Sequence, residues 1–529
     1  MIEKYYSGVI EQIYNRIGKE TRNIVMANYS NDFSIENLEV IRRYQSNEDN
    51  VFFAYSEFSY NTLVGAYEPF LDIICNMHRR FIGGSFDEFQ KECGVYYLHR
   101  QVLNSYYETG ECFREETVLL NEVEYEQRRM TMAIVDMLKR LSEVKPLMIV
   151  INRFQMASKS SIETIKYLID HPCTNIGIVL GVNASVKGAD STVEVWDRIV
   201  ESLEDRSAIY YIGSAKPLKN STRTSDDDEL YVTTNFEQSI QEASNTMEFL
   251  DYEQAKRGCR IIEHKIKFEG AWIDEKSLRR FYMVYARTSV LLGELSKALE
   301  LTNEYRALIQ EKNSEHDLSL FYFMKGTCYM YQGKLEKAEN CAKRAYDYAL
   351  LARDDMLEFK SELLSVMIKM SGWYNIFFCV QDIPVSDEII EKLIKHGYRN
   401  HLAHIYIYAY DNSREVVKQA FHDESVLKHF TKGLALAKKI GNEQLVYDAY
   451  QKTIMLASTN GFNEIAFLYV IRTYEFMKEH GNIYVARVLS SIGYNLSAMG
   501  KNELVDDYYN AAINMFYYLK MPEDIAEVY

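Results

Sequence analysis

Short apolar runs alternate with helical patterns over the first 215 residues. The runs lie at residues 23–27, 51–55, 147–151 and 176–182. Continuous apolar runs of this length indicate strands that are buried on both faces of a parallel sheet. Helical spacing at 35–44 and 161–169 predicts helices that connect the strands. The alternation therefore predicts an α/β domain with a parallel sheet over residues 1–215.

From about residue 236 to the end, apolar positions keep helical spacing and a motif recurs about every 40 residues. Residues 333–338 read Gly-Lys-Leu-Glu-Lys-Ala, and a looser copy occupies 293–298. Turn glycines align the copies, with Asn412 in register after the third of them: Gly293, Gly333, Gly372, Gly461 and Gly500. A period near 40 without a strand pattern predicts stacked pairs of antiparallel helices. An irregular helical domain is the alternative.

The copy that starts at Ser319 is similar to the tetratricopeptide pattern. Small residues that let two helices approach stand beside an aromatic residue: Gly326, Tyr329, Gly333, Ala338 and Ala345. The resemblance implies an all-α tetratricopeptide-like solenoid over residues 236–529, in which the first helix of each pair lines a groove for a partner. In this frame the groove candidates are Arg280, Arg287, Phe323, Met330, Gln451, Arg487 and Tyr494. Such side chains are typical of protein interfaces, and core packing or solvation is the alternative.

Composition fits a two-part protein of 529 residues and argues against some function classes. The chain has 76 Asp and Glu against 60 Lys and Arg, a net charge of −16 at pH 7. A nucleic-acid surface needs clustered lysine and arginine, so we expect no direct nucleic-acid partner. We find no apolar run long enough for a membrane span and no apolar signal segment, so we expect a cytoplasmic protein. The acidic run at 226–229 falls in a polar stretch that predicts an exposed linker at 216–235.

The α/β part resembles the signal transduction ATPases with numerous domains (STAND). The strand at 147–151 is followed by Asn152, Arg153 and a serine-rich stretch that leads into a helix, which is the frame of the second phosphate-site strand of that class. Residues 67–70 read Tyr-Glu-Pro-Phe, similar to a Tyr-Pro-Phe segment of the class, and Asn183 ends the next strand at the place of its sensor residue. The resemblance implies an AAA-like, P-loop fold with a phosphate loop at 28–34.

The residues of the implied nucleotide pocket depart from that class: Asn28, Asp32, Ser34, Asn152 and Arg153. A working phosphate loop needs glycines and a lysine, and 28–34 contains neither. Asp32 adds a like charge that costs about 1–4 kcal/mol against a phosphate at ~4 Å. Asn152 and Arg153 replace the carboxylate that would hold magnesium, for which an amide is a poorer ligand. We therefore expect a degenerate pocket, no cofactor and no ATP hydrolysis.

Other catalytic patterns are weak. Gly18 and Lys19 precede the first strand, whereas a phosphate loop follows its strand, so they predict a helix end with a turn. His401 and His404 share a helical face, but no carboxylate or cysteine completes a recognisable metal pattern nearby, and we expect no metal.

These patterns favour a binding protein over an enzyme. We expect a non-catalytic adaptor, chaperone-like or regulatory protein whose repeats bind a protein or peptide partner, an enzyme subunit being one candidate, with the α/β domain as a docking module. The alternative is a nucleotide-dependent STAND-type switch or transcription regulator that keeps ATP or ADP binding, although we see no basic DNA-binding segment after the repeats. The sequence leaves open the partner and the oligomeric state, whether homo- or hetero-oligomeric.

Overall fold

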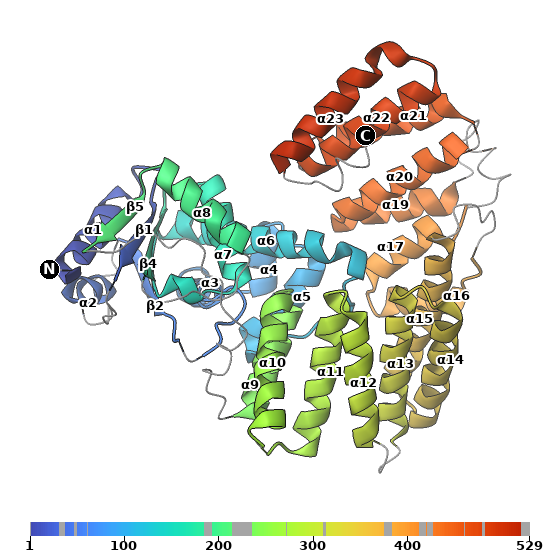
Figure 1. Ribbon diagram of the computed structural model, residues 1–529, viewed down its shortest axis with the longest axis horizontal. Coiled ribbons are helices and arrows are strands. Elements are labelled where there is room, and N and C mark those ends of the chain that lie inside the picture. The colour runs from blue at the N-terminus through green and yellow to red at the C-terminus, as the bar shows by residue number, and fades with distance from the viewer. Residues whose placement is uncertain are drawn as a thin grey trace. The chain divides into compact units, whose positions relative to one another are not determined.

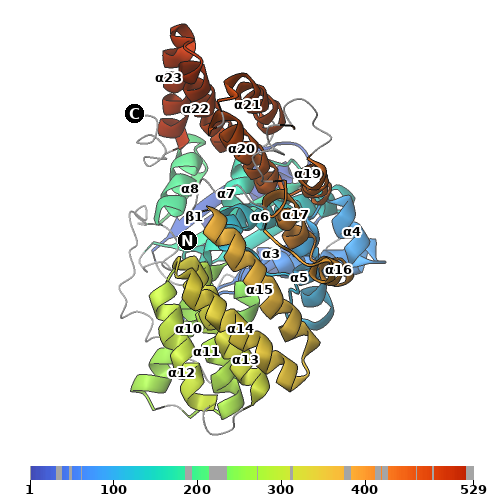
Figure 2. The same ribbon diagram turned by 90° about the vertical axis from the view of Figure 1, so that its right-hand side faces the viewer.

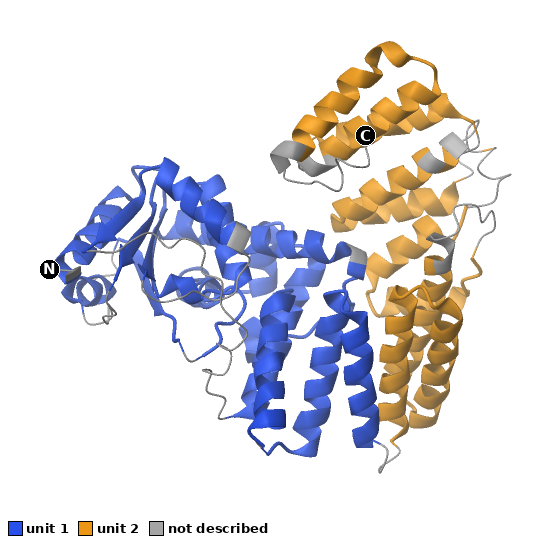
Figure 3. Cartoon of the chain, in the orientation of Figure 1, with its two compact units in different colours: residues 1–313 blue, residues 314–529 orange. Residues whose placement is uncertain are grey.

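The computed structural model describes most of the chain, which forms two compact units (Figure 3). The first unit spans Met1–Asn313 and the second spans Ser314–Tyr529. The described residues are 2–30, 38–46, 50–60, 62–184, 193–213, 235–270, 272–309, 314–374, 383–411, 419, 427–459, 461–478 and 482–519. Asp32, Ser34, Asn412 and the predicted linker up to residue 234 therefore lie outside the described residues.

Five parallel strands form a sheet in the first unit (Figure 1). The order is β2-β3-β4-β1-β5, with β1 at Ile24–Tyr29, β2 at Phe52–Glu57, β3 at Leu147–Asn152, β4 at Ile176–Asn183 and β5 at Ile209–Ile212. Four of these strands confirm the predicted ones. Every residue of β3 and β4 is buried, because both faces of the sheet are covered, and this explains their continuous apolar runs. The short edge strand β5 was not predicted, since its residues are partly exposed.

Helices cover both faces of the sheet, and strand side chains alternate between them. On one face, Met148 and Val150 pack with α1 (Ile2–Arg16) and α2 (Glu39–Ser46). On the other face, Ile149 and its neighbours pack with helices from the segments between β2 and β5. Those helices are α3 (Phe70–Met77), α4 (Phe86–Glu92), α5 (Tyr97–Thr109), α6 (Val123–Val144), α7 (Lys159–Asp170) and α8 (Val193–Asp205). The chain therefore leaves β1 toward one face of the sheet and β4 toward the other. In open parallel sheets, ligands bind at the carboxyl ends of two neighbouring strands that diverge in this way.

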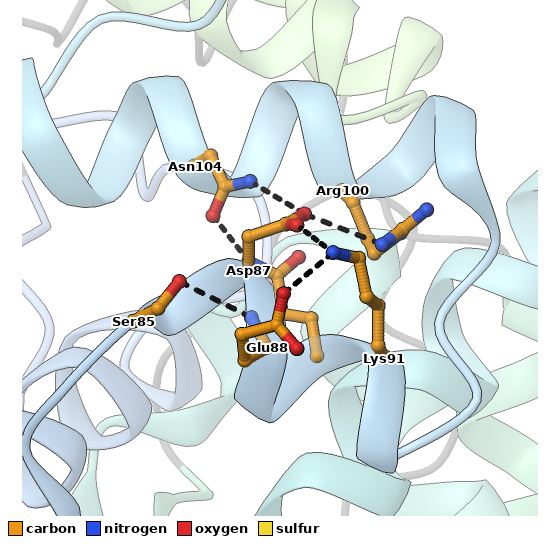
Figure 4. A network of polar contacts seen from close by, with 7 residues as sticks. Ser85, Asp87, Glu88, Lys91, Arg100 and Asn104 are labelled. Carbon is orange, nitrogen blue, oxygen red and sulfur yellow. Dashed lines mark hydrogen bonds and ion pairs between the residues drawn. The ribbon is translucent and has the colours of Figure 1, made fainter.

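Helices α4 and α5 are cross-linked through Asp87 (Figure 4). Lys91 Nζ lies 2.7 Å from Asp87 Oδ2, while Arg100 Nη1 and Asn104 Nδ2 lie 3.3 and 3.1 Å from Oδ1. Burial would raise the pKa of Asp87, but hydrogen bonds from Lys91 and Asn104 and the charge of Arg100 outweigh it and lower that pKa. The carboxylate stays charged and holds α4 against α5.

Four further helices of the first unit stack on one another (Figure 1). They are α9 (Phe236–Glu248), α10 (Tyr252–Phe268), α11 (Glu275–Leu291) and α12 (Leu295–Ile309). The main hydrophobic core of the sheet domain continues into α9 and α10 through Met247, Phe249, Leu250, Tyr252 and Ala255. The first helical pair is thus part of the same core as the sheet.

Backbone groups at this junction are also paired across it. Ser160 N, in the first turn of α7, donates to Asp251 Oδ2 at 3.0 Å, and Gln127 Nε2 of α6 donates to Leu250 O at 2.6 Å. Gln254 Nε2 of α10 donates to Val64 O at 2.8 Å. Buried hydrogen bonds of this kind fix the relative placement of the two parts, because each broken bond would leave a buried polar group without a partner.

The second unit is helical throughout its described residues. Its helices are α13 (Glu315–Tyr331), α14 (Leu335–Ala352), α15 (Asp355–Tyr374), α16 (Asp387–Lys395), α17 (Arg399–Tyr408), α19 (Lys428–Ile440), α20 (Glu443–Thr459), α21 (Asn463–Met477), α22 (Asn482–Ala498) and α23 (Val505–Leu519). Consecutive helices pack on one another, as Figure 2 shows for α21, α22 and α23. Among the helices of the described residues, none combines the length and the apolar character that a bilayer crossing requires.

Glycines in the left-handed conformation end several of these helices. Four of the predicted turn glycines are confirmed by positive φ angles: Gly293 (72°), Gly333 (70°), Gly461 (80°) and Gly500 (72°). The prediction for Gly372 is wrong, because this residue lies inside α15. Gly397, with φ of 72°, makes the turn after α16 instead. The predicted turn at Gly18 (φ 78°) after α1 is confirmed.

The small residues of the best sequence copy do let helices approach closely. A Cβ added to Gly326 of α13 would lie 3.2 Å from Leu364 Cδ2 of α15 and 3.3 Å from Cys341 Cβ of α14. Both distances are near the lower limit for real side chains, so a larger residue would push the helices apart. The glycine therefore lets α13 pack closely on α14 and α15.

Candidate functional site

The predicted nucleotide pocket maps to the carboxyl end of the sheet. Asn28 lies in β1, and Asn152 and Arg153 lie at the end of β3, while Asp32 and Ser34 are outside the described residues. Strand β4 separates β1 from β3. By alternation along the strands, Asn28 shares a face with Met26, toward the α6 side, whereas Asn152 shares a face with Val150, toward α1. The structure therefore brings Asn152 and Arg153 together but leaves Asn28 on the opposite face.

A tyrosine from β1 contacts Asn152 across β4. The Tyr29 hydroxyl donates to Asn152 Oδ1 at 2.5 Å, and the Arg153 backbone N–H donates to the same oxygen at 2.9 Å. Gly181 of β4 lies beneath this contact, since a Cβ added there would be 2.9 Å from Asn152 Oδ1. The ring of Tyr6 from α1 packs edge-on against Tyr29, with ring centres 6.2 Å apart. Both rings are fully buried, so side chains of the protein fill this strand end.

Charges at this edge of the sheet are paired with one another. Arg153 Nη1 lies 3.1 Å from Glu57 Oε1, and its guanidinium group lies 4.7 Å from the ring centre of Tyr60. Glu57 also accepts a hydrogen bond from Tyr55. Burial, with Tyr29, Tyr55 and Glu57 nearby, raises the pKa of Tyr6 well above its ordinary value, so this phenol stays neutral.

Three buried amide atoms remain near the strand ends. Within the described part of the chain, Asn28 Oδ1, Asn152 Nδ2 and Gln155 Nε2 have no hydrogen-bond partner. Amides and neutral phenols do not fit a magnesium ion, which prefers carboxylate and water oxygens. Among the described residues, no group of three or more His, Cys, Asp or Glu is placed to hold a metal.

Two of the predicted groove arginines, Arg280 and Arg287 of α11, contact side chains of α9, the first helix of the preceding pair. Arg280 Nη2 of α11 donates to Gln241 Oε1 of α9. Seven residues further along both helices, Arg287 Nη2 lies 3.1 Å from Glu248 Oε1. Both guanidinium groups thereby tie α11 to α9 within the first unit.

The other predicted groove residues lie in the second unit and differ in exposure. Met330 of α13 is buried with Ala338 and Leu364, and Phe323 packs against the same cluster, so the alternative of core packing describes this pair. Gln451 of α20 and Arg487 of α22 are partly buried. Tyr494 of α22 is 60% exposed. Of the predicted groove residues in this unit, Tyr494 presents the most surface to a partner.

A buried ionic cluster at the junction of the sheet domain and α9–α11 was not predicted. Arg114, only 5% exposed, donates from Nη2 to Glu248 O at 2.7 Å, and its Nε lies 3.8 Å from Glu248 Oε2. Arg287 contacts the other oxygen of the same carboxylate. Glu248, at the end of α9, is therefore held between two guanidinium groups, one buried and one half-exposed.

A second buried carboxylate lies in the same junction. Glu126 of α6 contacts His99 Nε2 of α5 at 2.6 Å through Oε2, and Arg129 Nη1 at 3.4 Å through Oε1. Burial raises the pKa of Glu126 to about 7. Burial, assisted by the charges of Arg114 and Arg129, lowers the pKa of His99 well below its ordinary value. Burial thus shifts the two pKa values in opposite directions, and each shift favours the neutral form of its group.

We expect Glu126→Gln to be more stable than the wild type at pH 8 and to lose this advantage as the pH falls toward 4.5. The folded-state pKa of about 7 exceeds the ordinary 4.5, so the stability from Glu126 is complete below 4.5 and lost as the pH rises through 7. Glutamine mimics the protonated carboxyl group at every pH. The difference should reach about 3 kcal/mol above pH 7, measured by urea unfolding from pH 5 to 8.

The exposed Glu143 on the same helix offers a matched control. Glu143→Gln should change the free energy of unfolding by less than about 0.5 kcal/mol at every pH. A difference between Glu126→Gln and the wild type that stays constant with pH would contradict the assignment of the titration to Glu126. The altered pKa of His99 acts in both proteins and therefore cancels in this difference to first order.

No protein-family model matches the chain, and no curated protein matches it either. Similar solved structures include NprR in complex with its cognate peptide NprX, at 12% identity and a TM-score of 0.34 over 53% of this chain and 78% of that one. A Rap protein complexed with Competence and Sporulation Factor matches at 10% identity and a TM-score of 0.34 over 64% and 90% of the two chains. A STAND protein with a tetratricopeptide repeat sensor from Pyrococcus horikoshii matches at 12% identity and a TM-score of 0.32 over 98% and 84%. TM-scores of this size carry no argument about the fold or function of the chain.

The contacts between repeats leave a signal in the sequence. Gln241 and Arg280 are 39 residues apart, and so are Glu248 and Arg287. Pairs of complementary polar residues separated by the repeat period indicate neighbouring helices of successive repeats. Such pairs predict that both arginines lie in contacts between repeats.

Proposed function

We propose that the chain is a non-catalytic, cytoplasmic regulatory or adaptor protein that binds a protein or peptide partner through its helical repeats. In this proposal the α/β domain is a docking module that neither hydrolyses nor requires a nucleotide. The observation that supports it most is the contact between Tyr29 and Asn152, which fills the strand end where a nucleotide-binding sheet needs open space.

Sequence and structure support the loss of nucleotide chemistry independently. The segment 28–34 has neither the glycines nor the lysine that a phosphate loop uses. At the other side of the implied pocket, Asn152 is fully buried and its oxygen accepts two hydrogen bonds from the protein itself. A magnesium-bound phosphate would have to displace the Tyr29 hydroxyl and would then meet an amide in place of a carboxylate.

The repeats support the binding half of the proposal. Stacked helical pairs bury a continuous core and leave extended outer surfaces, which such arrays use for partners. Tyr494, exposed on α22, is the kind of aromatic residue that contributes most at protein interfaces. The competing proposal, a STAND-type switch, requires that nucleotide binds despite the tyrosine rings at the strand end.

Thermal unfolding with millimolar Mg-ATP or Mg-ADP distinguishes the two proposals. We expect no change in the unfolding temperature of the wild type, because Tyr29 fills the strand end. A nucleotide that did bind would be detected, since a ligand at 100 times its dissociation constant adds about 2.7 kcal/mol of stability. Tyr29→Ala is the informative variant, since it removes the ring that covers Asn152. A shift in the wild type would favour the switch, whereas a shift confined to Tyr29→Ala would identify this ring as the barrier to nucleotide.

A further inference from the structure

Helix α19 is basic although the chain as a whole is acidic. Its sequence, KHFTKGLALAKKI, contains four lysines and one histidine and no acidic residue. We define the basic face of α19 as the exposed residues Lys428, His429, Lys432, Lys438 and Lys439. The opposite side of the helix, at Phe430, Gly433, Ala437 and Ile440, is buried in the second unit. The helix is thus anchored by one side and presents its cations with the other.

Three of these lysines form one stripe. At 3.6 residues per turn, Lys428, Lys432 and Lys439 fall within about 40° of one another, with Lys438 to one side. The stripe is about 16 Å long, because each residue advances the helix by about 1.5 Å. An extended peptide of about five residues, at about 3.3 Å per residue, covers the same length.

Two lysines of this face, Lys432 and Lys438, contact tyrosine side chains rather than carboxylates. Lys432 Nζ donates to the Tyr406 hydroxyl of α17 at 3.1 Å, and Lys438 Nζ donates to the Tyr450 hydroxyl of α20 at 2.9 Å. Within the described residues, none of the four lysines forms an ion pair with Asp or Glu. By contrast, Lys91, Lys297 and Lys392 each contact at least two carboxylates. Phenols position an ammonium group without cancelling its charge, so the face keeps its positive potential.

Among the described residues of the neighbouring elements, no acidic group forms an ion pair with a lysine of this face, although Asp411 contacts its histidine. Asp411 accepts hydrogen bonds on Oδ2 from the backbone N–H groups of His429 and Phe430, at 2.8 and 2.9 Å, and its Oδ1 lies 3.4 Å from His429 Nδ1. Asp448 of α20 accepts from Gln444, and Glu443, at the start of α20, also has contacts of its own.

Helix stability accounts for only part of this arrangement. Lys438 and Lys439 suit the carboxyl end of a helix, whereas Lys428 stands in the first turn, where a cation opposes the helix dipole. The Asp411 carboxylate at this helix end is hydrogen-bonded to backbone N–H groups and not to the Lys428 ammonium group. Lys428 therefore adds nothing to the helix that the fold requires, which points to a function outside the fold.

We infer that the basic face of α19 binds an acidic segment of a protein partner, one with about five residues rich in Asp and Glu. This inference rests on the proposed function and names where and by what chemistry the repeats bind. Tyr406 and Tyr450 lie buried beneath the lysines, at 5% and 7% exposure, so they offer no platform on which nucleic-acid bases could stack. The apolar side of α19 is buried, so it cannot insert into a membrane.

Binding of a fluorescein-labelled deca-glutamate peptide to the full chain tests the inference. We expect the charge reversal K428E/K432E/K439E to weaken binding at least about tenfold, since each exposed ion pair contributes up to about fivefold. The matched control is K334E/K337E/K343E, which makes the same change of charge at three exposed lysines of another helix. Lys334 directly precedes α14, and the other two lysines lie within it. The control should change the affinity by less than about twofold. Binding to the wild type should also weaken with added salt.

The variant K428Q/K432Q/K439Q guards against loss of the fold, because it removes the charges without introducing repulsion. Circular dichroism and thermal unfolding should match the wild type, and peptide binding should still weaken. Absence of peptide binding by the wild type, or equal loss in the α14 control, would overturn the inference. Tighter binding of a ten-nucleotide oligothymidylate or of phosphatidylserine vesicles to the same face would overturn it too.

Capture of a partner from host extract separates this inference from the proposed function. If the wild type and the glutamine variant retain the same stoichiometric partner, the repeats bind a protein but α19 does not contact it. Failure of the wild type to retain any partner, with peptide binding intact, would count against the proposed function while the basic face of α19 stands as an anionic-peptide site.

Discussion

A chain that ends at residue 235 is expected to lack a stable fold, whereas one that ends at residue 313 should fold cooperatively. The shorter chain contains the whole sheet but lacks Met247, Phe249, Leu250 and Tyr252, which belong to the same hydrophobic core. Burying each large apolar side chain contributes about 1.5–3 kcal/mol, so their loss removes about 6–12 kcal/mol. The total stability of a domain is about 5–15 kcal/mol.

The two truncations can be compared by near-ultraviolet circular dichroism and urea unfolding. Residues 1–313 should give a sharp transition, because they comprise one compact unit. Residues 1–235 should show no cooperative transition and should be digested rapidly by protease. A cooperative transition of the shorter chain would mean that the sheet domain folds independently, with the boundary at 215–235 that the sequence predicts.

We expect Glu248→Ala to lower the free energy of unfolding of the first unit by about 3–5 kcal/mol. The substitution leaves the buried Arg114 without its carboxylate, and an uncompensated buried charge is costly. Arg114 cannot lose its proton to escape this cost. Urea unfolding of residues 1–313 at pH 7 measures the effect.

Arg287→Ala is the matched control, because it removes the half-exposed partner of the same carboxylate. Its cost should be at most about 1 kcal/mol, as for exposed ion pairs. The double variant Arg114→Met with Glu248→Leu should recover most of the stability, since apolar side chains can replace a buried pair. Equal costs for Glu248→Ala and Arg287→Ala would contradict the role assigned to burial.

The strands could be predicted because their burial is simple. Strands β3 and β4 are buried on both faces, and a continuous apolar run has few other interpretations at that length. Strand β5 reads Ile-Tyr-Tyr-Ile at a partly exposed edge, and a run of four residues carries too little pattern. The sheet order, by contrast, depends on contacts between distant segments that no local pattern encodes.

Repeat period alone did not determine where the turns lie. Gly333 follows the period and makes a turn, whereas Gly372, 39 residues later, lies within the 20-residue helix α15. A glycine is tolerated in a helix at a cost of about 1 kcal/mol, so its presence does not require a turn. A turn glycine instead follows the next helix, α16, at Gly397.

The sequence predicted which residues belong to the candidate sites, but it did not predict which side chains they contact. The resemblance to the STAND class predicts that Asn152 stands in place of a carboxylate. Its hydrogen-bond partner, Tyr29, belongs to a strand that does not pair with β3. Similarly, Arg287 was predicted as a groove residue from its position alone, and its contact with Glu248 of the preceding repeat was not predicted. In both cases a side chain far away in the sequence supplies the contact, and only the three-dimensional arrangement shows it.

The hydrogen bond between Tyr29 and Asn152 has an evolutionary consequence. Replacing Asn152 by Asp in one step would bury a carboxylate between two neutral phenols, with no room for the ion that would stabilise it. Room would appear only if Tyr29 and Tyr6 also became smaller, and each of those changes alone would open a destabilising void. Any single substitution toward a metal-binding strand end would therefore lower the stability of this fold before a bound metal could raise it.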